Sequence, residues 1–318
     1  MQLSPAYWDK LQQTLQSELD LDIPKLSAQP IAGGDIHTAF RIFGADERSW
    51  FIKLNQDDHL AMLQAEVAGL QALDAVAAIR VPKVVGCGRC ERLAYLVMEY
   101  LSLSHAGDEQ RLGEALANLH KASLKHSELR RSLELGRGVE LRYGFAQDNF
   151  IGLTAQANQP SNNWQQFWLQ QRLLPQLELA YRNGFADPLR EHAKPLIPAV
   201  EQLLAEHRPA GVLLHGDLWS GNKGFVAVDG DKVPVLFDPA CYYGDRETDL
   251  AMTELFGGFS PAFYQGYQTV WPLEPDYPLR KPIYQLYHLL NHLNLFGGGY
   301  LNQVVSCMAQ IKAQSPSR

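Results

Sequence analysis

The sequence predicts an α+β protein with two lobes, a β-rich lobe over residues 1–101 and a mostly helical lobe over residues 102–318. Three observations support this fold class. The chain has 318 residues, which is enough for two domains or one large bilobal unit. Apolar residues alternate along short segments before Leu101, as in strands, and recur every three or four residues after it, as in helices. No low-complexity linker separates the two parts, so we expect the lobes to join tightly near residues 99–104.

In the first lobe, a helix is expected before the strands. Trp8, Leu11, Leu15 and Leu19 lie at helical spacing and predict an amphipathic helix over residues 5–20, which Pro24 ends. The same periodicities predict the remaining elements of this lobe: strands and turns over 28–44 and 49–55, a helix over 57–73, and strands over 81–88 and 93–101.

The second lobe reads as helices interrupted by a short β segment. Its first helix is predicted over residues 109–124, and the segment 143–152, rich in Gly, Asp and Asn, is expected to be a loop. Pro175 lies inside the helical pattern of 162–184, where it predicts a break or kink because proline cannot donate a helical hydrogen bond. The elements that follow are a helix over 187–207, strands within 211–222, 224–228 and 233–241, and a helical C-terminal third.

Composition and charge narrow the class of protein. With 46% hydrophobic and 20% charged residues the chain is an ordinary globular protein, and a net charge of −7 argues against nucleic acid as the main partner. The N-terminus has no signal-peptide pattern, and no apolar run approaches the ~20 residues that span a bilayer. We therefore expect a cytoplasmic protein without membrane contact. The sequence leaves its oligomeric state open.

Cys87 and Cys90 have CxxC spacing. A redox motif of this kind opens a helix, and a zinc site needs two further soft ligands at matching spacing. Here the pair lies between two predicted strands, so we interpret it as two reduced cysteines in a turn.

The stretch "LLHGDLWSGN" carries the first sign of chemistry. Asp217 and Asn222 have four residues between them, and Asp238 ends an apolar run sixteen residues after Asn222. Each residue alone would more often cap a turn than take part in catalysis. Two strands joined by a short turn would bring Asn222 and Asp238 to one end of a hairpin, with Asp217 on the preceding loop. A kinase needs this set: one carboxylate for the attacking hydroxyl, and an amide oxygen and a second carboxylate for Mg²⁺.

A kinase also needs a lysine for the nucleotide phosphates and a glutamate that holds it. Lys53 lies in an otherwise apolar strand, and Glu66 follows thirteen residues later in a helix. Separately, they read as an edge-strand lysine and a solvent-facing glutamate. Because Asp217, Asn222 and Asp238 follow them along the chain as in a kinase, Lys53 and Glu66 predict an ion pair at the phosphates. Gly33 and Gly34 lie between strands and would let the backbone approach phosphates, although an ordinary hairpin turn explains them equally well.

These residues belong to a wider resemblance. The sequence resembles the fructosamine kinase (ketosamine-3-kinase) family, within the aminoglycoside phosphotransferase and choline kinase-like branch of the protein-kinase-like fold. The resemblance covers nearly the whole chain. It is most specific in "HGDLWSGN", the loop "YGFAQDNFIG" and the helix "NNWQQFWLQQRLLPQL", and it extends to "GGDIHTAFRI", "FIKLN", "EVAGLQAL", "VMEYL", "LGEALANLH", "FDPACYYGDRETDLAM" and "YQLYHLLNHLNLFGGGY".

The resemblance implies roles for single residues. Asp217 is the expected catalytic base, Asn222 and Asp238 the Mg²⁺ ligands, Lys53 the lysine that binds the ATP phosphates, and Glu66 its partner. The supporting positions are then Glu99 and Leu101 as hinge residues offering backbone groups to the adenine, His215 as the residue that orients the catalytic loop, Asp249 as a support of the metal-binding loop, and residues 33–38 as the phosphate-covering loop. Asp35 adds a negative charge to that loop, where family members often have Cys or Ser. Trp219 is expected either to stack on a sugar-like substrate or to pack the loop in place.

The leading hypothesis is therefore an ATP- and Mg²⁺-dependent kinase that phosphorylates the 3-hydroxyl of ketosamines, which are sugars condensed on small amines or on protein lysines. The implied role is deglycation, with ribulosamines and erythrulosamines expected before fructosamines. Two alternatives stand beside it: a phosphotransferase acting on an aminoglycoside, choline or homoserine, and a catalytically inactive pseudokinase that only binds.

Overall fold

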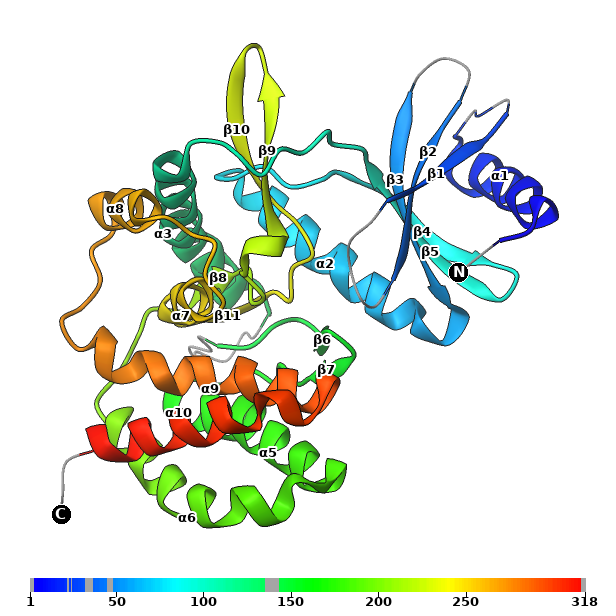
Figure 1. The fold of residues 1–318 in the computed structure, drawn as a ribbon. Coiled ribbons are helices and arrows are strands. Elements are labelled where there is room, and N and C mark those ends of the chain that lie inside the picture. Colours follow the sequence, from blue (N-terminus) through cyan, green and yellow to red (C-terminus); the bar gives the residue numbers. More distant parts are fainter. Residues whose placement is uncertain are drawn as a thin grey trace.

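The computed structural model describes residues 3–21, 23, 25–31, 37–44, 48–134 and 143–315, with the backbone alone for 126–134. It has an α+β fold of two lobes, as predicted. Figure 1 shows a β-sheet with one helix beside it on the right, and a larger helical lobe on the left and below. In the described part of the chain, none of the helices combines the length and the apolar character needed to cross a bilayer.

The first lobe is built on one antiparallel sheet of five strands in the order β1-β2-β3-β5-β4. Lys53 stands in the middle strand, opposite Ala39 on one side and Leu96 on the other. A central position fixes this lysine on one face of the sheet, because side chains alternate between faces along a strand. The strands are β1 (Ser27–Ile31), β2 (Thr38–Phe43), β3 (Ser49–Gln56), β4 (Val84–Cys90) and β5 (Leu93–Glu99).

Two helices cover the two faces of this sheet. Helix α1 (Pro5–Leu19) packs through Leu11 and Leu15 on the face that carries Ile52 and Leu54 of β3. Helix α2 (Leu60–Val76), preceded by the 3₁₀ turn η1 (Asp57–His59), packs on the opposite face of β5. Lys53 alternates with Ile52 and Leu54, so its side chain is on the α2 face, where Glu66 lies.

The cysteine pair departs from expectation. Cys87 and Cys90 lie within β4, and the turn to β5 is made by Glu91 and Arg92, with Glu91 at a φ of 54°. Both thiols are free, and burial raises the pKa of Cys87 to about 11. The turn position that we predicted for these cysteines is therefore wrong.

The second lobe is mostly helical, as predicted. Helix α3 (Glu109–Glu134) packs against α8, while α9 packs against α7 and α10, and α10 also packs against α6 (Figure 1). Its remaining helices are α4 (Trp164–Trp168), α5 (Leu174–Ala180), α6 (Ala186–Leu203), α7 (Glu247–Leu255), α8 (Pro261–Val270), α9 (Tyr277–Phe296) and α10 (Leu301–Gln314), with 3₁₀ turns η4 (Ser220–Asn222) and η5 (Gly298–Tyr300).

The irregularity expected near Pro175 is a π-helical turn, η2 (Leu169–Leu173), between α4 and α5. The N–H of Leu174 donates to the carbonyl of Leu169, five residues earlier. Pro175 has no N–H to give to the carbonyl of Gln171, and the guanidinium of Arg172 donates to that carbonyl instead, at 2.9 Å. A second π-helical turn, η3 (Tyr181–Phe185), joins α5 to α6.

Three two-stranded sheets complete the second lobe: β6 (Asn149–Ile151) with β7 (Thr154–Gln156), β8 (Val212–Leu214) with β11 (Tyr242–Gly244), and β9 (Lys223–Val228) with β10 (Asp231–Leu236). The last pair stands out from the lobe in Figure 1. The segment between the lobes is tied to this hairpin, because Ser104 and Phe225 exchange backbone hydrogen bonds of 2.8 and 2.9 Å.

Candidate active site

The loop that follows β8 is held by one buried carboxylate. Asp249, in the first turn of α7, accepts the backbone N–H groups of His215 at 2.8 Å and of Gly216 at 2.9 Å. Its carboxylate also lies 3.2 Å from Nε2 of His120, a fully buried histidine of α3. Burial opposes ionisation of Asp249, but the contact with His120 outweighs it and lowers the pKa of the carboxyl. Asp249 therefore fixes the backbone just before Asp217.

Gly216 shapes the same loop. It has a φ of 82°, and a Cβ at this position would lie 2.1 Å from the carbonyl oxygen of Ala240. Only glycine fits both the conformation and the close approach. His215 beside it is buried, and its Nε2 lies 2.9 Å from the carbonyl of Phe237. These two contacts tie the loop to the segment that carries Asp238.

Asp217 and Asn222 face each other across this loop. The Nδ2 atom of Asn222 donates to the backbone carbonyl of Asp217 at 2.9 Å and to its carboxylate at 3.3 Å. Burial, followed by the charge of Asp238, raises the pKa of Asp217 from 3.8 to about 7. A carboxyl that titrates near neutral pH can accept a proton from a hydroxyl group under physiological conditions.

Asp238 lies just after the second strand of the β9–β10 hairpin, which ends at Leu236. Lys223 pairs with Leu236, so Asn222 and Phe237 lie side by side just beyond the last pair, and the N–H of Phe237 donates to the carbonyl of Asn222 at 3.1 Å. This is the hairpin arrangement expected from the spacing. Asp238 has a φ of 57°, in the left-handed region that non-glycine residues seldom occupy.

Lys53 joins the two lobes at this point. Its ammonium lies 2.7 Å from Glu66 and 2.6 Å from Asp238, and its side chain is 6% exposed. Burial alone would lower the pKa of Lys53, but the two carboxylates outweigh it and raise the pKa. Burial, together with the charge of Asp238, outweighs the contact with Lys53 and raises the pKa of Glu66 to about 7.

Close packing of α2 sets the distance between Glu66 and Asp238. Gly69 lies three residues after Glu66, and a Cβ there would be 3.1 Å from Pro239 and 3.4 Å from Cys241. A larger residue would push α2 away from the segment 239–241. The structure thus brings Lys53, Glu66, Asp217, Asn222 and Asp238 together from four segments: strand β3, helix α2, the loop after β8 and the segment after β10.

The donor set of this cluster fits Mg²⁺. The amide of Asn222 is engaged through its nitrogen, which leaves its oxygen as the atom for a cation. Asp238 uses Oδ1 for Lys53, and its side chain keeps 40% of its surface exposed. One carboxylate and one amide oxygen are hard ligands of the kind that Mg²⁺ prefers when phosphates and water complete its shell.

The expected nucleotide positions are only partly described. Gly33, Gly34 and Asp35 lie outside the described residues. Glu99 uses its carboxylate for Arg80 at 2.6 Å, and its N–H donates to the carbonyl of Lys83 at 2.8 Å. Leu101 follows in the segment between the lobes. The backbone contacts of Glu99 and Leu101 with an adenine therefore stay predictions.

Trp219 packs against its own loop and is partly exposed. Its indole lies against the loop, because a Cβ on Gly221 would be 2.2 Å from the ring, and 42% of its surface is exposed. The segment after α7 approaches the same loop closely, because a Cβ on Gly258 would be 2.4 Å from the Cβ of Ser220. The structure thus shows the ring packed on its loop, and its stacking on a sugar-like substrate stays a prediction.

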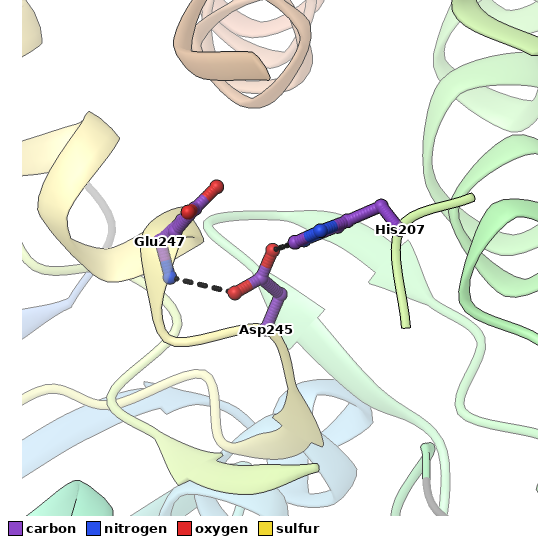
Figure 2. Close-up of side chains that lie close together, drawn as sticks. All are labelled: His207, Asp245 and Glu247. Atoms are coloured by element: carbon purple, nitrogen blue, oxygen red, sulfur yellow. Dashed lines mark hydrogen bonds and ion pairs between the residues drawn. The ribbon is translucent and has the colours of Figure 1, made fainter. Parts of the chain in front are cut away.

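A second group of titratable residues, shown in Figure 2, has ligand atoms within 4.8 Å of one another: His207, Asp245 and Glu247. These atoms already have protein partners. Asp245 lies 2.7 Å from Nε2 of His207 and accepts the hydroxyl of Tyr284 at 2.6 Å. Glu247 accepts two hydrogen bonds of 2.7 Å from Arg280, and burial followed by the charge of Asp245 raises its pKa to about 7. We interpret the group as a buried ion-pair network.

His120 is the residue at this site that sequence reasoning missed. Its signal was present, because it follows Leu116 by four residues and so lies on the apolar face of α3. A polar residue on an apolar stripe needs a buried partner. That partner, Asp249, is 129 residues away in sequence, so no local pattern could identify it.

Comparisons with known proteins find sequences similar to nearly the whole chain. The family model described as fructosamine kinase matches residues 7–314. A protein named "Probable ketoamine kinase slr1563" from Synechocystis is 40% identical over 311 residues, covering 96% of this chain and 97% of that protein. The probable ketoamine kinase of Vibrio cholerae is 38% identical, with 96% and 99% of the two chains covered.

Solved structures give the same picture for the fold. A crystal structure assigned as fructosamine-3-kinase from Haemophilus somnus superimposes with a TM-score of 0.79 at 27% identity, over 96% of this chain and 97% of that one. An aminoglycoside phosphotransferase shares the fold with a TM-score of 0.63 at 16% identity, over 96% and 98% of the two chains.

Proposed function

Because the chain belongs to the fructosamine kinase family and is an ATP-dependent phosphotransferase, we propose that it phosphorylates the 3-hydroxyl of ketosamines. The observation that carries this proposal is the cluster at the junction of the lobes. In it, Asp217, whose pKa is raised to about 7, accepts a hydrogen bond from Asn222. Beside them, Lys53 forms ion pairs with both Glu66 and Asp238.

Asp217 is the proposed catalytic base. It accepts the proton of the attacking hydroxyl as the bond to the γ-phosphorus of ATP forms and the bond from that phosphorus to the β,γ-bridging oxygen breaks, which releases ADP. Asp249, through the backbone of His215 and Gly216, holds Asp217 in place for this transfer. Phosphoryl transfer depends mainly on such positioning and on charge stabilisation.

Lys53 is the proposed phosphate-binding residue, and Glu66 keeps its ammonium in position. Asn222 and Asp238 would hold Mg²⁺, which when bound supplies positive charge to the phosphates. Residues 33–38 would cover the phosphates, with Gly33 and Gly34 allowing close approach, and backbone groups of Glu99 and Leu101 would bind the adenine. We also propose that the lobes divide at residues 101 and 102.

Trp219 is proposed as the acceptor-binding residue. Its exposed aromatic face suits the apolar face of a sugar and the cationic amine of a ketosamine. We expect ribulosamines and erythrulosamines to be better acceptors than fructosamines, on small amines or on protein lysines. Phosphorylation at this hydroxyl would make the adduct unstable, so we propose a deglycation role in the cytoplasm.

The test is a coupled ADP-release assay with ribuloselysine, fructoselysine, choline and kanamycin as acceptors. The proposal requires turnover of a ketosamine and a phosphorus–proton coupling at the 3-position in the NMR spectrum of the product. Turnover of choline or kanamycin alone would instead favour the aminoglycoside or choline type of phosphotransferase. A protein that binds ATP but phosphorylates none of the four acceptors, and whose rate of ADP release does not change in Asp217→Ala, would be a pseudokinase.

A further inference from the structure

One group of four buried polar side chains lies outside the cluster of proposed catalytic residues. Asn149 and Gln156 are on β6 and β7, Asn158 follows β7, and Arg172 is in the π-helical turn η2. Their exposed fractions are 4%, 2%, 1% and 0%, in that order. Buried polar groups need hydrogen-bond partners, so the partners of these four show what the group holds together.

The four side chains form one continuous chain of hydrogen bonds. Arg172 donates to Oδ1 of Asn158 at 2.7 Å, and Asn158 donates to Oδ1 of Asn149 at 2.8 Å. Asn149 then donates to the backbone carbonyl of Cys241 at 2.8 Å. Gln156 donates to Asn149 at 2.7 Å and to the carbonyl of Ala240 at 3.3 Å. We name these four residues the amide relay.

The relay ends on the segment that carries Asp238. This segment is held on one side by the catalytic loop, since the N–H of Phe237 donates to Asn222 and the N–H of Ala240 donates to His215 at 2.8 Å. The relay holds the other side, through the carbonyls of Ala240 and Cys241. Asp238 itself has a φ of 57°, and a non-glycine residue keeps such a conformation only where its surroundings enforce it.

The far end of the relay is a buried cation. Among the described residues Arg172 has no carboxylate partner. Its guanidinium donates to the carbonyl of Ala157 at 2.5 Å and lies 4.0 Å from the ring centre of Tyr242 and 4.7 Å from that of Phe167. The charge is therefore balanced by backbone carbonyls and aromatic faces, which fix the planar group in one orientation.

We propose that the amide relay is a positioning device for phosphoryl transfer: it sets the backbone of residues 238–241 so that the Asp238 carboxylate meets the metal together with Asn222. The inference rests on the proposed roles of Asn222 and Asp238. It assigns a role to the two segments, 143–152 and 162–177, in which the resemblance to the family is most specific and which contribute none of the proposed catalytic residues.

A network that merely stabilised the fold would behave differently when cut. Loss of a merely stabilising contact lowers the melting temperature and leaves the Mg²⁺ requirement unchanged. Loss of a residue that orients a metal ligand typically weakens metal binding by about 10- to 100-fold. The dependence of nucleotide binding on Mg²⁺ therefore separates the two roles without relying on turnover.

The decisive variant is Gln156→Met, which keeps the length of the side chain and removes its amide. The matched control is Gln176→Met in α5. Gln176 is 3% exposed, and its amide bonds to Asn291 and Asn294 rather than to residues 238–241. Both variants lose a buried amide network, and only Gln156→Met cuts the relay. Arg172→Lys is the second relay variant, because lysine keeps the charge but lacks the planar guanidinium whose two terminal nitrogens donate separately to Ala157 and Asn158.

Binding of the non-hydrolysable analogue AMP-PNP is measured by calorimetry over a range of Mg²⁺ concentrations, together with the melting temperature. We expect Gln156→Met to raise the Mg²⁺ concentration for half-maximal binding about 10-fold or more and to leave affinity without Mg²⁺ within about twofold of the wild type. Gln176→Met should lower the melting temperature by a similar amount and keep the wild-type Mg²⁺ dependence. If Gln156→Met does not fold, Arg172→Lys decides, with a shift in the same direction.

Equal Mg²⁺ dependence in the relay variants and the wild type overturns the inference, and so does an equal shift in Gln176→Met. The proposed function fails on a separate reading. If the wild type turns over no ketosamine, the acceptor assignment is wrong, while Mg²⁺-dependent binding of AMP-PNP still tests the relay.

Discussion

Replacement of Asp217 by asparagine should stabilise the protein while it greatly slows turnover. The pKa of this carboxyl rises from 3.8 to about 7 on folding, chiefly by burial. A raised carboxyl pKa means that ionisation is less favourable in the folded chain than in the unfolded chain. The wild type therefore loses stability as the pH rises from about 4 to about 7, and the loss is constant above that range. Asp217→Asn has no charge to desolvate and can still accept the hydrogen bond from Asn222.

The size of the effect follows from the two pKa values. A change from 3.8 to about 7 corresponds to about 4 kcal/mol for a carboxyl fully removed from water. Asp217 keeps part of its surface exposed, and solvent screens part of the effect, so we expect about half of that value. Asp217→Asn should thus exceed the wild type in free energy of unfolding by about 2 kcal/mol at pH 8 and by less than about 1 kcal/mol at pH 5.

The measurement is urea unfolding at pH 5 and pH 8 without nucleotide or Mg²⁺. Asp9→Asn, at an exposed position of α1, is the control for removal of a carboxylate and should show no such pH dependence. In parallel, Asp217→Asn should lower kcat by about 10²- to 10⁴-fold. A stability difference that does not change between the two pH values would refute the assigned environment of Asp217. Unchanged kcat would refute its role as base.

Substitutions at four further positions test other parts of the site. Lys53→Met should lower kcat/KM for ATP by about 100-fold or more, and Glu66→Gln by about tenfold, in initial-rate assays; equal effects would contradict the supporting role of Glu66. Trp219→Ala should raise KM for the ketosamine about tenfold without changing KM for ATP, and Trp219→Phe should restore most of it; a parallel rise in both KM values would mean that Trp219 only packs the loop. Gly258→Ala, at a φ of 87° against Ser220, should lower the free energy of unfolding by about 1–2 kcal/mol in urea, and an unchanged value would show that the backbone there is not constrained.

The cluster of proposed catalytic residues could be predicted because each of its members follows a local signal. Asp217, Asn222 and Asp238 are arranged by one loop and one hairpin, so their spacing in sequence implies their proximity in space. Lys53 and Glu66 are separated by a single strand-to-helix connection. Short connections leave few arrangements, and a sequence pattern can therefore fix the geometry.

The amide relay could not be predicted, because its partners are distant in sequence and chemically ordinary. Asn149 and Gln156 lie in a segment rich in turn-forming residues, and their bonds to Cys241 and Ala240 span 92 and 84 residues. Asparagine and glutamine occur on most protein surfaces, so neither composition nor periodicity indicates that these two are buried.

The error at Cys87 and Cys90 has a specific cause. The pair stands between two predicted strands, and we interpreted it as the turn that joins them. In the structure strand β4 continues to Cys90, and its glycines lie where other groups approach closely: a Cβ at Gly86 would be 2.2 Å from Leu19 and one at Gly88 would be 2.7 Å from the hydroxyl of Tyr95. Glycine is needed there because helix α1 and a neighbouring side chain approach the strand closely.

The position of the Lys53 ammonium between Glu66 and Asp238 has a consequence for ligand binding. A cation that binds Asp238 competes with Lys53 for that carboxylate, and an anionic phosphate that binds Lys53 competes with Asp238 for the ammonium. A cation bound to Asp238 thus releases Lys53 for the phosphate, and a phosphate bound to Lys53 releases Asp238 for the cation. Linkage makes such an effect reciprocal, so the affinity for ATP should rise with Mg²⁺ by the same factor by which the affinity for Mg²⁺ rises with ATP. We therefore expect this single ion pair of 2.6 Å to favour simultaneous binding of the nucleotide and the proposed metal ion over binding of either one alone.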